Sequence, residues 1–293
     1  MSADVHETGG SESGAGGSDA GTSATDDRAE RPLLAVARFE GRNRLRITGV
    51  IAAVFVLYGL IYVWLGPELV VGSAITDLVE ALPPVLRQLL GFESFASVEG
   101  LLASEFYTFG WMVGLGGYLA YSAATTVSGD LRDGRMDTLL AAPAARSGVL
   151  LGKFLALLVP IALLSVVVPV GLYVAAVAVG TPLSLADLLV LHALSIPYLL
   201  VWSGAGLLLG AVVRRGRTAG RVALGLVFFG WLFESVVGVT DYAWTGAVSP
   251  MRYFDPPAIL NHGEYDLVGA GVLLVAAVAL VAISLVWFGR HDL

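Results

Sequence analysis

Six long apolar stretches constrain this chain more than any other feature. A helix that crosses a bilayer needs about 20 predominantly apolar residues. The stretches that meet this requirement are 47–65, 106–127, 154–180, 188–213, 222–239 and 267–289. Only 14% of the 293 residues are charged, against about 25% in soluble globular domains. The sequence therefore predicts an all-α integral membrane protein with six transmembrane helices, located in the cell membrane as a multi-pass protein.

The segments before the first apolar stretch have a different composition. Residues 1–29 are rich in Gly, Ser, Thr and acids and cannot bury enough apolar surface to offset the entropy of ordering, so they are predicted to be a disordered tail. Residues 30–293 are predicted to form one transmembrane domain. Residues 32–46 mix apolar residues with arginines, which favours a helix lying at the inner interface. The alternative for this segment is an ordinary charged flank.

The positions of the cations predict the orientation. Lys and Arg are retained on the cytoplasmic side of membrane proteins. With the N-terminus inside, all of the 17 cations except Arg87 and Arg252 fall on the cytoplasmic side. We therefore expect both termini to be cytoplasmic.

The loop between the second and third apolar stretches, residues 128–153, is the most densely charged part of the chain after the tail. Its charges alternate in sign, apolar residues lie between them, and Pro143 ends the helical run. The residues concerned are Asp130, Leu131, Arg132, Asp133, Arg135, Met136, Asp137, Leu139 and Leu140. An amphipathic helix of this kind can place its apolar residues in a groove of a soluble partner. The alternative is a solvated turn between two spans.

This loop resembles the cytoplasmic signature of ABC-2 type transporter permeases. In that signature an acidic residue and a Gly-x-x-x-Leu-Leu run precede Pro and Arg, and Gly-Lys follows at the start of the next span. The residues that fill the pattern are Asp130, Gly134, Arg135, Met136, Asp137, Leu139, Leu140, Pro143, Arg146, Gly152 and Lys153. Asp130 stands where the family commonly has Glu, and Pro-Ala-Ala-Arg stands for Pro-Val-Ser-Arg. The terminal WFGRHDL is similar to the Phe-x-x-x-Asp ending of the family.

The resemblance implies a permease that pairs with a second copy or a paralogue and binds an ATPase subunit on its cytoplasmic face. It implies that the solute or lipid-like substrate moves outward. We expect four residues of the loop to dock the ATPase and three to fix the register by ion pairing. The docking residues are Leu131, Met136, Leu139 and Leu140, and the pairing residues are Arg132, Arg135 and Asp137.

Nucleotide chemistry is expected to belong to the partner subunit. A phosphate-binding Gly-x-x-x-x-Gly-Lys-Ser/Thr loop is missing from the sequence, since its one Gly-Lys pair, Gly152 and Lys153, is followed by Phe154. ATP and Mg²⁺ would therefore bind the partner, and no cofactor, metal or nucleic acid is expected on this chain. The absence of cysteine excludes disulfides and thiol catalysis.

Glu234 is the one acid inside the apolar stretches. It lies roughly 18 Å along the fifth stretch from its inner end, at about 1.5 Å per residue. A charged group inside a bilayer is a functional candidate, so Glu234 either pairs with another polar group or lines a solute path. His192 is expected to form an interfacial hydrogen bond near Asp187.

Two other classes of protein compete with a permease. An intramembrane hydrolase would need a serine and a histidine in contact, yet Ser203 and His192 lie eleven residues apart on one predicted helix, roughly 16 Å along its axis. A membrane scaffold or receptor without transport activity is the other alternative. Closely spaced glycines, such as Gly206 and Gly210, indicate close helix packing, either within the chain or at a dimer interface.

Overall fold

All regular structure in the described part of the chain is helical. The computed structural model describes residues 20–70, 81–83, 86, 97–132, 146–181, 183–213 and 215–290. The predicted all-α fold class is confirmed for these residues. The long helices are α1 (Ala20–Val70), α5 (Gly116–Arg132), α7 (Arg146–Val179), α8 (Leu185–Val212), α9 (Gly216–Val237) and α11 (Leu267–Arg290).

Five helical segments are long and apolar enough to cross a membrane. They are Arg44–Glu68 within α1, Gly148–Val179 within α7, and the whole of α8, α9 and α11. Each contains or closely matches one of the apolar stretches 47–65, 154–180, 188–213, 222–239 and 267–289. The chain is thus a multi-pass membrane protein.

The remaining apolar stretch, 106–127, falls in a helix of mixed geometry. The backbone is helical without a break through α4 (Val98–Leu101), the π-helix η2 (Leu102–Leu115) and α5. In η2 the wider turn is visible in the bond from the Gly116 N–H to the carbonyl of Trp111, five residues earlier. Neither η2 nor α5 alone reaches about 20 residues, but together they cover the predicted stretch.

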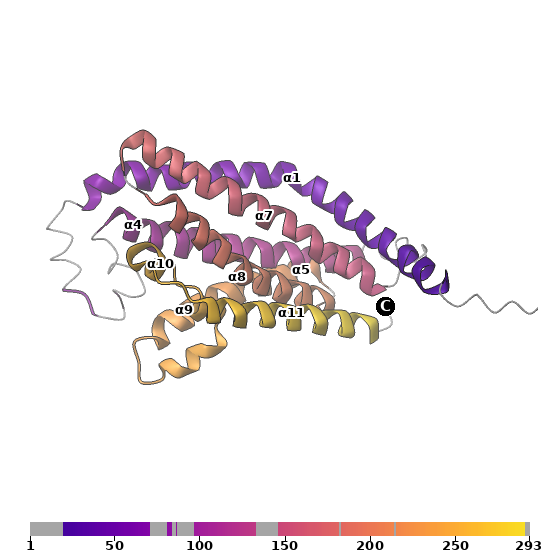
Figure 1. Cartoon of the computed structure of the whole chain (residues 1–293). Coiled ribbons are helices and arrows are strands. Elements are labelled where there is room, and N and C mark those ends of the chain that lie inside the picture. The colour runs from indigo at the N-terminus through magenta and orange to yellow at the C-terminus, as the bar shows by residue number, and fades with distance from the viewer. Residues whose placement is uncertain are drawn as a thin grey trace, which may run out of the picture.

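The helices pack side by side in one elongated bundle (Figure 1). Helix α1 packs along α7, while α8 packs against both α5 and α11. The indigo start of α1 and the yellow end of α11 lie at the same end of the bundle, on the right of Figure 1. We call this end the inner end and the opposite one, where α4 and α10 lie, the outer end. Helix α1 begins at Ala20, inside the segment predicted as a tail, and continues through 32–46 into the first span.

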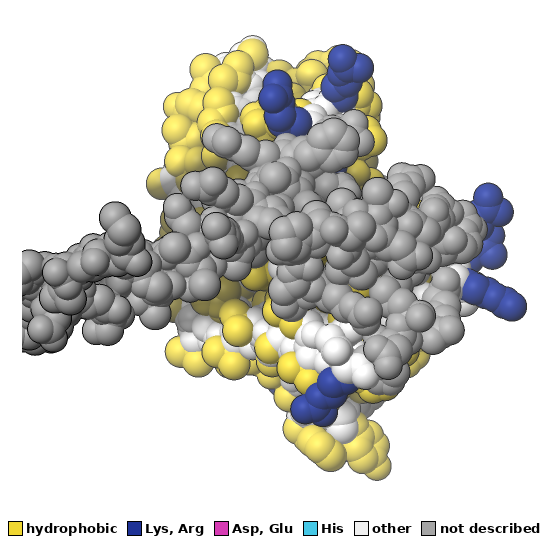
Figure 2. All heavy atoms as spheres, turned by 90° about the vertical axis from the view of Figure 1, so that its right-hand side faces the viewer, with side chains coloured by type: hydrophobic (Ala, Val, Ile, Leu, Met, Phe, Trp, Pro, Cys, Tyr) yellow, Lys and Arg dark blue, Asp and Glu magenta, His cyan; other side chains and the backbone are white. Residues whose placement is uncertain are grey.

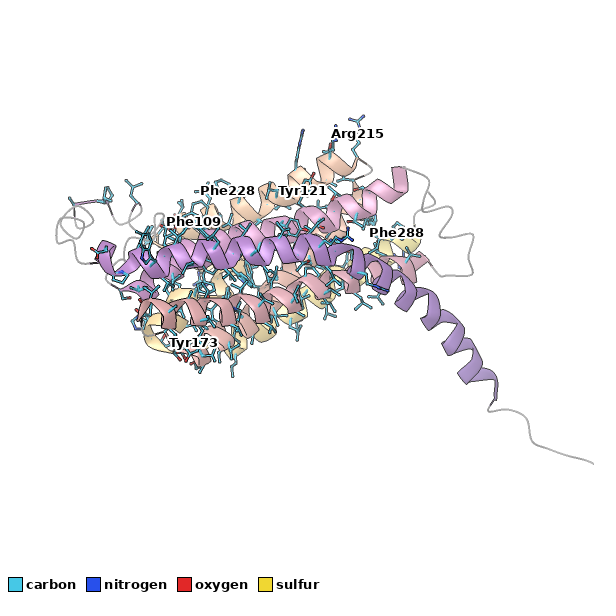
Figure 3. All side chains as sticks on the ribbon, turned by 90° about the horizontal axis from the view of Figure 1, so that it is seen from above. Phe109, Tyr121, Tyr173, Arg215, Phe228 and Phe288 are labelled. Carbon is cyan, nitrogen blue, oxygen red and sulfur yellow. The ribbon has the colours of Figure 1, made fainter. Side chains whose placement is uncertain are left out.

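An aromatic cluster around η2 forms the centre of the core. Phe106, Tyr107 and Trp111 are fully buried. Phe55 of α1 meets the rings of Phe106 and Trp111 edge-on at 5.8 and 5.4 Å between centroids. His192 of α8 meets Trp111 edge-on at 4.6 Å. Figure 3 shows side chains filling the space between the helices along the length of the bundle.

Glycines bring α5 and α8 into backbone contact. A Cβ at Gly206 would overlap the carbonyl oxygen of Ala120, and one at Gly210 would meet the carbonyl oxygen of Ala124. Small residues permit such an approach in lipid, where helices associate by packing. Of the two interpretations of these glycines, the structure supports packing within the chain.

Three short helices between α9 and α11 were not predicted from the sequence. They are η3 (Ala243–Val248), η4 (Pro250–Tyr253) and α10 (Pro256–His262). The Asp255 side chain accepts a 3.1 Å hydrogen bond from the Ala258 N–H and so caps α10. Gly263 ends α10 at φ +65°, a left-handed conformation that glycine adopts without strain. These helices close the outer end over η2, α8 and α9.

Candidate functional site

The predicted ATPase-coupling loop is approached by two helices at the inner end. Asp130, Leu131 and Arg132 form the last residues of α5, and Arg146 is the first residue of α7. The other predicted residues, except Lys153, lie outside the described residues. They are Asp133, Gly134, Arg135, Met136, Asp137, Leu139, Leu140 and Pro143. The structure thus places the two attachment points of the loop at the inner end, and the docking contacts stay a prediction.

Lys153 lies inside a helix, in the second turn of α7, and its side chain is 3% exposed. Gly152, beside it, is also in the interior of α7. A phosphate-binding loop needs backbone N–H groups that are free of helix bonding before the helix begins. The Gly-Lys pair therefore lacks the backbone geometry of a nucleotide site.

Arg44 joins α1 to the helix that leads into the loop. Its Nη1 donates to Ser122 Oγ at 2.6 Å and its Nη2 donates to Thr126 Oγ1 at 3.0 Å. Ser122 and Thr126 lie one turn apart on α5, so the planar guanidinium spans both hydroxyls. The start of the first span is thereby attached to the last turns before residue 133.

A small apolar cluster holds the same end together. Val127 of α5 packs with residues of α7, α8 and α11, namely Val149, Leu150, Leu207, Val281 and Phe288. Phe288 and Arg215 mark this end in Figure 3, opposite Phe109 and Tyr173. Because four helices share the cluster, a displacement of the end of α5 has to move its neighbours as well.

The two ends differ in charge. Figure 2 looks onto the inner end and shows Lys and Arg side chains around its rim. The acidic residues whose side chains are described belong to elements at the outer end: Glu68, Glu99, Glu105, Asp187, Glu234, Asp241, Asp255, Glu264 and Asp266. Five further acids, Asp26, Asp27, Glu30, Glu40 and Asp130, lie in the parts of α1 and α5 at the inner end. Cations at the inner end are what the sequence predicts if that end faces the cytoplasm.

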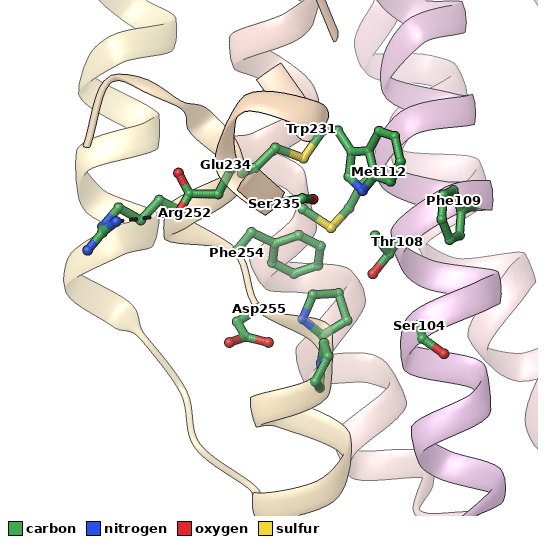
Figure 4. Close-up of a pocket in the computed structure, with 13 residues that line it drawn as sticks. Ser104, Thr108, Phe109, Met112, Trp231, Glu234, Ser235, Arg252, Phe254 and Asp255 are labelled. Atoms are coloured by element: carbon green, nitrogen blue, oxygen red, sulfur yellow. Dashed lines mark hydrogen bonds and ion pairs between the residues drawn. The ribbon is translucent and has the colours of Figure 1, made fainter. Parts of the chain in front are cut away.

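A polar pocket opens at the outer end between η2, α9 and the short helices (Figure 4). Its volume is about 260 Å³. The rings around it are those of Phe109, Trp231 and Phe254. The charged side chains that line it are Glu234, Arg252 and Asp255. We call this cavity the outer pocket.

Glu234 is paired there with Arg252. Arg252 Nη1 lies 3.3 Å from Glu234 Oε1 and donates a shorter bond, 2.7 Å, to the carbonyl of Ala243. Glu234 Oε2 is buried and has no hydrogen-bond partner among the described residues. A Cβ at Gly246 would overlap Oε2, so the pair needs glycine at that position. Of the two interpretations of Glu234, the structure shows the pairing, and a place on a solute path stays a prediction.

Tyr198 and Ser249 fix the walls of the outer pocket. The Tyr198 hydroxyl, on α8, lies 3.2 Å from the Met112 carbonyl of η2 and 3.0 Å from Met251 Sδ of η4. Ser249 Oγ donates to the Gly230 carbonyl of α9 at 3.2 Å. These bonds attach η4 and the Ser249 turn to α8, η2 and α9.

His192 does not form the interfacial bond expected near Asp187. Its side chain is fully buried, and Nδ1 lies 2.7 Å from the Leu188 carbonyl one turn earlier. Asp187 instead accepts a 2.8 Å bond from the Tyr265 hydroxyl. The Ser203 hydroxyl is bound to the Leu199 carbonyl at 2.8 Å, which leaves a serine-histidine pair unsupported. Within the described residues, no three His, Asp or Glu side chains gather closely enough to hold a metal ion.

Only part of the outer pocket could be predicted from the sequence. Glu234 stood out because an acid in an apolar stretch is costly. Arg252, 18 residues later, did not stand out because it lies in an outer connection whose three short helices were not predicted. The signals available were its high density of aromatic residues and the Ser249-Pro250 and Asp255-Pro256 pairs, each of which places a capping side chain before a proline at a helix start.

Several helices long and apolar enough to cross a membrane define a polytopic membrane protein. Residues 34–293 match the family described as ABC-2 family transporter protein, and the chain belongs to that family. No curated protein matches the chain.

Proposed function

We propose that this chain is the permease of an ABC-2 type exporter, driven by ATP hydrolysis on a separate cytoplasmic ATPase. It has six spans, the second being the continuous helix 98–132, and both of its termini are cytoplasmic, with 32–46 at the inner interface. It acts in the plasma membrane as a dimer with a second copy or a paralogue. Each permease binds one ATPase, which holds the ATP and Mg²⁺.

Membership of the ABC-2 family is the observation that carries this proposal. Such permeases generally act with a cytoplasmic ABC ATPase. The cations at the inner end favour a cytoplasmic position for the two helix ends that flank 133–145. The buried Gly152–Lys153 pair also favours a separate ATPase, because α7 gives it no phosphate-binding geometry.

The loop 128–153 is the proposed coupling element. Leu131, Met136, Leu139 and Leu140 dock the ATPase, and closure of the ATPase pair then displaces the end of α5. The bonds from Arg44 to Ser122 and Thr126 pass that displacement to α1, while the apolar cluster around Val127 passes it to α7, α8 and α11. The helices shift as a unit between inward-facing and outward-facing arrangements.

Glu234 is proposed to lie on the path of the solute or lipid-like substrate. The support for this role is its position on α9, in the wall of the outer pocket. A carboxylate at this depth is costly unless it is paired or used. The pocket is the place where an outward-moving substrate would pause before release.

Co-purification with candidate ATPases tests the coupling loop. We expect the wild-type chain to capture an ATPase from a co-expressed set, and the double variant Leu139→Asp/Leu140→Asp to insert normally and lose it. Acids at these positions would oppose burial in an apolar groove. ATP hydrolysis measured in lipid should exceed that of the free ATPase when the wild-type chain is present and should stay at the level of the free ATPase when the double variant is present.

A matched control carries the same chemical change to the other end. Val248→Asp/Leu267→Asp alters two exposed apolar side chains at the outer end and should leave capture of the ATPase unchanged. If the wild type captures no ATPase, or the loop variant captures it as well as the wild type, the coupling assignment is wrong. A membrane scaffold without transport activity would then be the better account.

A further inference from the structure

We propose that the outer pocket is a binding site for an organic ammonium group, with Glu234 as its counter-ion. The ammonium is carried by a free amine with one ring or by the head group of a lipid. This inference deepens the proposed function and rests on it only for the subsequent movement of the ligand. Binding itself needs neither the ATPase nor the coupling loop.

The carboxylate of Glu234 has unused capacity for a donor. An ionised carboxylate offers about four acceptor positions. In the structure Oε1 accepts one bond at 3.3 Å, longer than the roughly 2.7–2.9 Å of a strong charge-assisted bond. Oε2 is buried without a partner among the described residues. Oε2 lies against Gly246, so the carboxylate has to turn away from Gly246 and Arg252 before a ligand with several N–H donors can supply the missing bonds.

The contact between Arg252 and Glu234 can be broken at a small cost in free energy. Its Nη1 is held more tightly by the Ala243 carbonyl, at 2.7 Å, than by Glu234. The described charged side chains that line the pocket are two acids, Glu234 and Asp255, and one cation, Arg252, so their formal charge sums to −1. An incoming cation therefore competes with Arg252 for Glu234, whereas an incoming anion meets net repulsion.

The rings of the outer pocket favour the same class of ligand. Phe109, Trp231 and Phe254 line it, and Trp231 lies 5.1 Å from Phe109 between ring centroids. Aromatic faces attract ammonium groups within about 6 Å, Trp most strongly. They also pack against the apolar body of an amine. Carboxylates beside aromatic rings select a cation with an apolar portion over an inorganic ion.

The site has walls held by hydrogen bonds and lies near the outer surface. Tyr198 and Ser249 hold its walls by the hydrogen bonds described above. Tyr242 and Trp244, just before and at the start of η3, are exposed. Amphipathic rings of this kind occur at the level of lipid head groups. The pocket is thus within reach both of dissolved amines and of head-group amines.

Calorimetric titration of the purified full-length chain in an uncharged maltoside detergent tests the proposal. The probes are 2-phenylethylammonium, neutral 2-phenylethanol and anionic 3-phenylpropionate, which share one ring. We expect the ammonium to bind more tightly than the other two. Glu234→Gln should weaken its binding by about ten-fold or more, because a hydrogen bond to a charged group is lost. Arg252→Gln should strengthen it several-fold by removing the competing cation.

Glu105→Gln provides the matched control. Glu105 is a partly buried acid of the same outer end that does not line the outer pocket, and its substitution should leave binding of the ammonium unchanged. Equal binding of the three probes, preference for the anion, or no effect of Glu234→Gln would overturn the proposal. So would a loss of binding in Arg252→Gln in a sample that elutes as wild type.

Two further experiments complete the test. The first distinguishes a lipid amine from a free amine, and the second distinguishes the ammonium site from the ATPase-coupling loop. In phosphatidylcholine nanodiscs, added phosphatidylethanolamine that weakens binding of the probe identifies a lipid amine, and no competition identifies a free amine; either result supports an ammonium site. The variant Leu139→Asp/Leu140→Asp should bind the ammonium as the wild type does. Failure of ATPase capture with intact ammonium binding would therefore overturn only the coupling assignment.

Discussion

The inner and outer ends of the bundle are built in opposite ways. At the inner end cations surround the rim, and α1 is joined to α5 by an arginine bound to two neutral hydroxyls. At the outer end three short helices fold back over the bundle, and an arginine there is paired with a carboxylate on the wall of a cavity. The described inner end thus consists of long packed helices, whereas the outer end contains a pocket.

Under the proposed function, this difference separates the contacts that would transmit force from the side chains that would recognise a ligand. A partner that displaces helices needs helix–helix contacts that stay the same with and without a ligand. Packed apolar side chains and hydroxyls that are already hydrogen-bonded provide such contacts. A site that recognises a solute needs polar capacity left unused, at a cost in stability, and Glu234 Oε2 has it. Contacts between α5 and α8 connect the two regions along the bundle.

The largest expected effect comes from disrupting the backbone contact between α5 and α8, the helices that connect the two ends. Gly206→Ala would place a methyl group on the carbonyl oxygen of Ala120. Backbone cannot yield as a side chain can, so α8 would have to move away from α5, at a cost of about 3 kcal/mol. We expect a clear fall in the melting temperature of the detergent-solubilised chain, together with loss of ammonium binding.

Gly225→Ala is the control for that substitution. Gly225 lies in α9, and a Cβ there meets nothing within 4 Å. Alanine is the better helix former by about 1 kcal/mol, so its melting temperature should stay level or rise. A Gly206→Ala chain as stable as the Gly225→Ala chain would show that α5 and α8 are not in backbone contact.

A smaller effect is expected from loosening the inner end alone. Arg44→Ala removes the bonds to Ser122 and Thr126, which are part-buried, and should lower the stability of the chain by about 1–2 kcal/mol. The coupling of the ATPase should weaken while ammonium binding is retained. Thermal unfolding and ATP hydrolysis in lipid measure the two effects.

Arg46→Ala is the matched change for Arg44, since Arg46 is an exposed arginine on the same helix. Surface substitutions of this kind usually change stability by no more than about 0.5 kcal/mol. If both variants lose the same stability, the contribution of Arg44 is a general effect of charge and the link to α5 carries no weight.

The spanning helices could be predicted from the sequence better than the outer pocket could. Spanning helices are dictated by length and apolarity, so five of the predicted stretches appear in the structure as apolar spanning helices. The wide turns of η2 carry no such signature, because an α- and a π-helix are equally apolar. The Glu234–Arg252 pair depends on how η3 and η4 fold back, and hydropathy does not encode that path.

A third prediction sharpens the outer end. Gly246→Ala places a methyl group on Glu234 Oε2 and close to Arg252 Nη1. Because the Glu234 carboxylate is the end of a flexible side chain, it can swing aside, so the stability cost should be about 1 kcal/mol or less. Ammonium binding should nevertheless fall markedly, since the counter-ion has moved. ATPase capture should not change.

Gly271→Ala is the comparison for Gly246, because a Cβ at Gly271 meets nothing within 4 Å. It should bind the ammonium as the wild type does. A Gly246→Ala chain with normal ammonium binding would mean that the position of Glu234 in the outer pocket does not matter for recognition, and the contrast between the two ends would then rest on charge alone.

The smallest effect is expected at the contact between Tyr265 and Asp187, at the edge of the outer end. The hydrogen bond to Asp187 raises the pKa of the Tyr265 hydroxyl. A raised pKa in the folded state means that this contribution to stability is fully present below the unfolded value of about 10 and is lost as the pH rises through the folded value. Tyr265→Phe should therefore lower the melting temperature slightly at neutral pH, and the difference from wild type should shrink as the pH rises above 10. A difference that stays constant across that range would mean that the lost contact is packing of the ring, because only the hydroxyl proton titrates there.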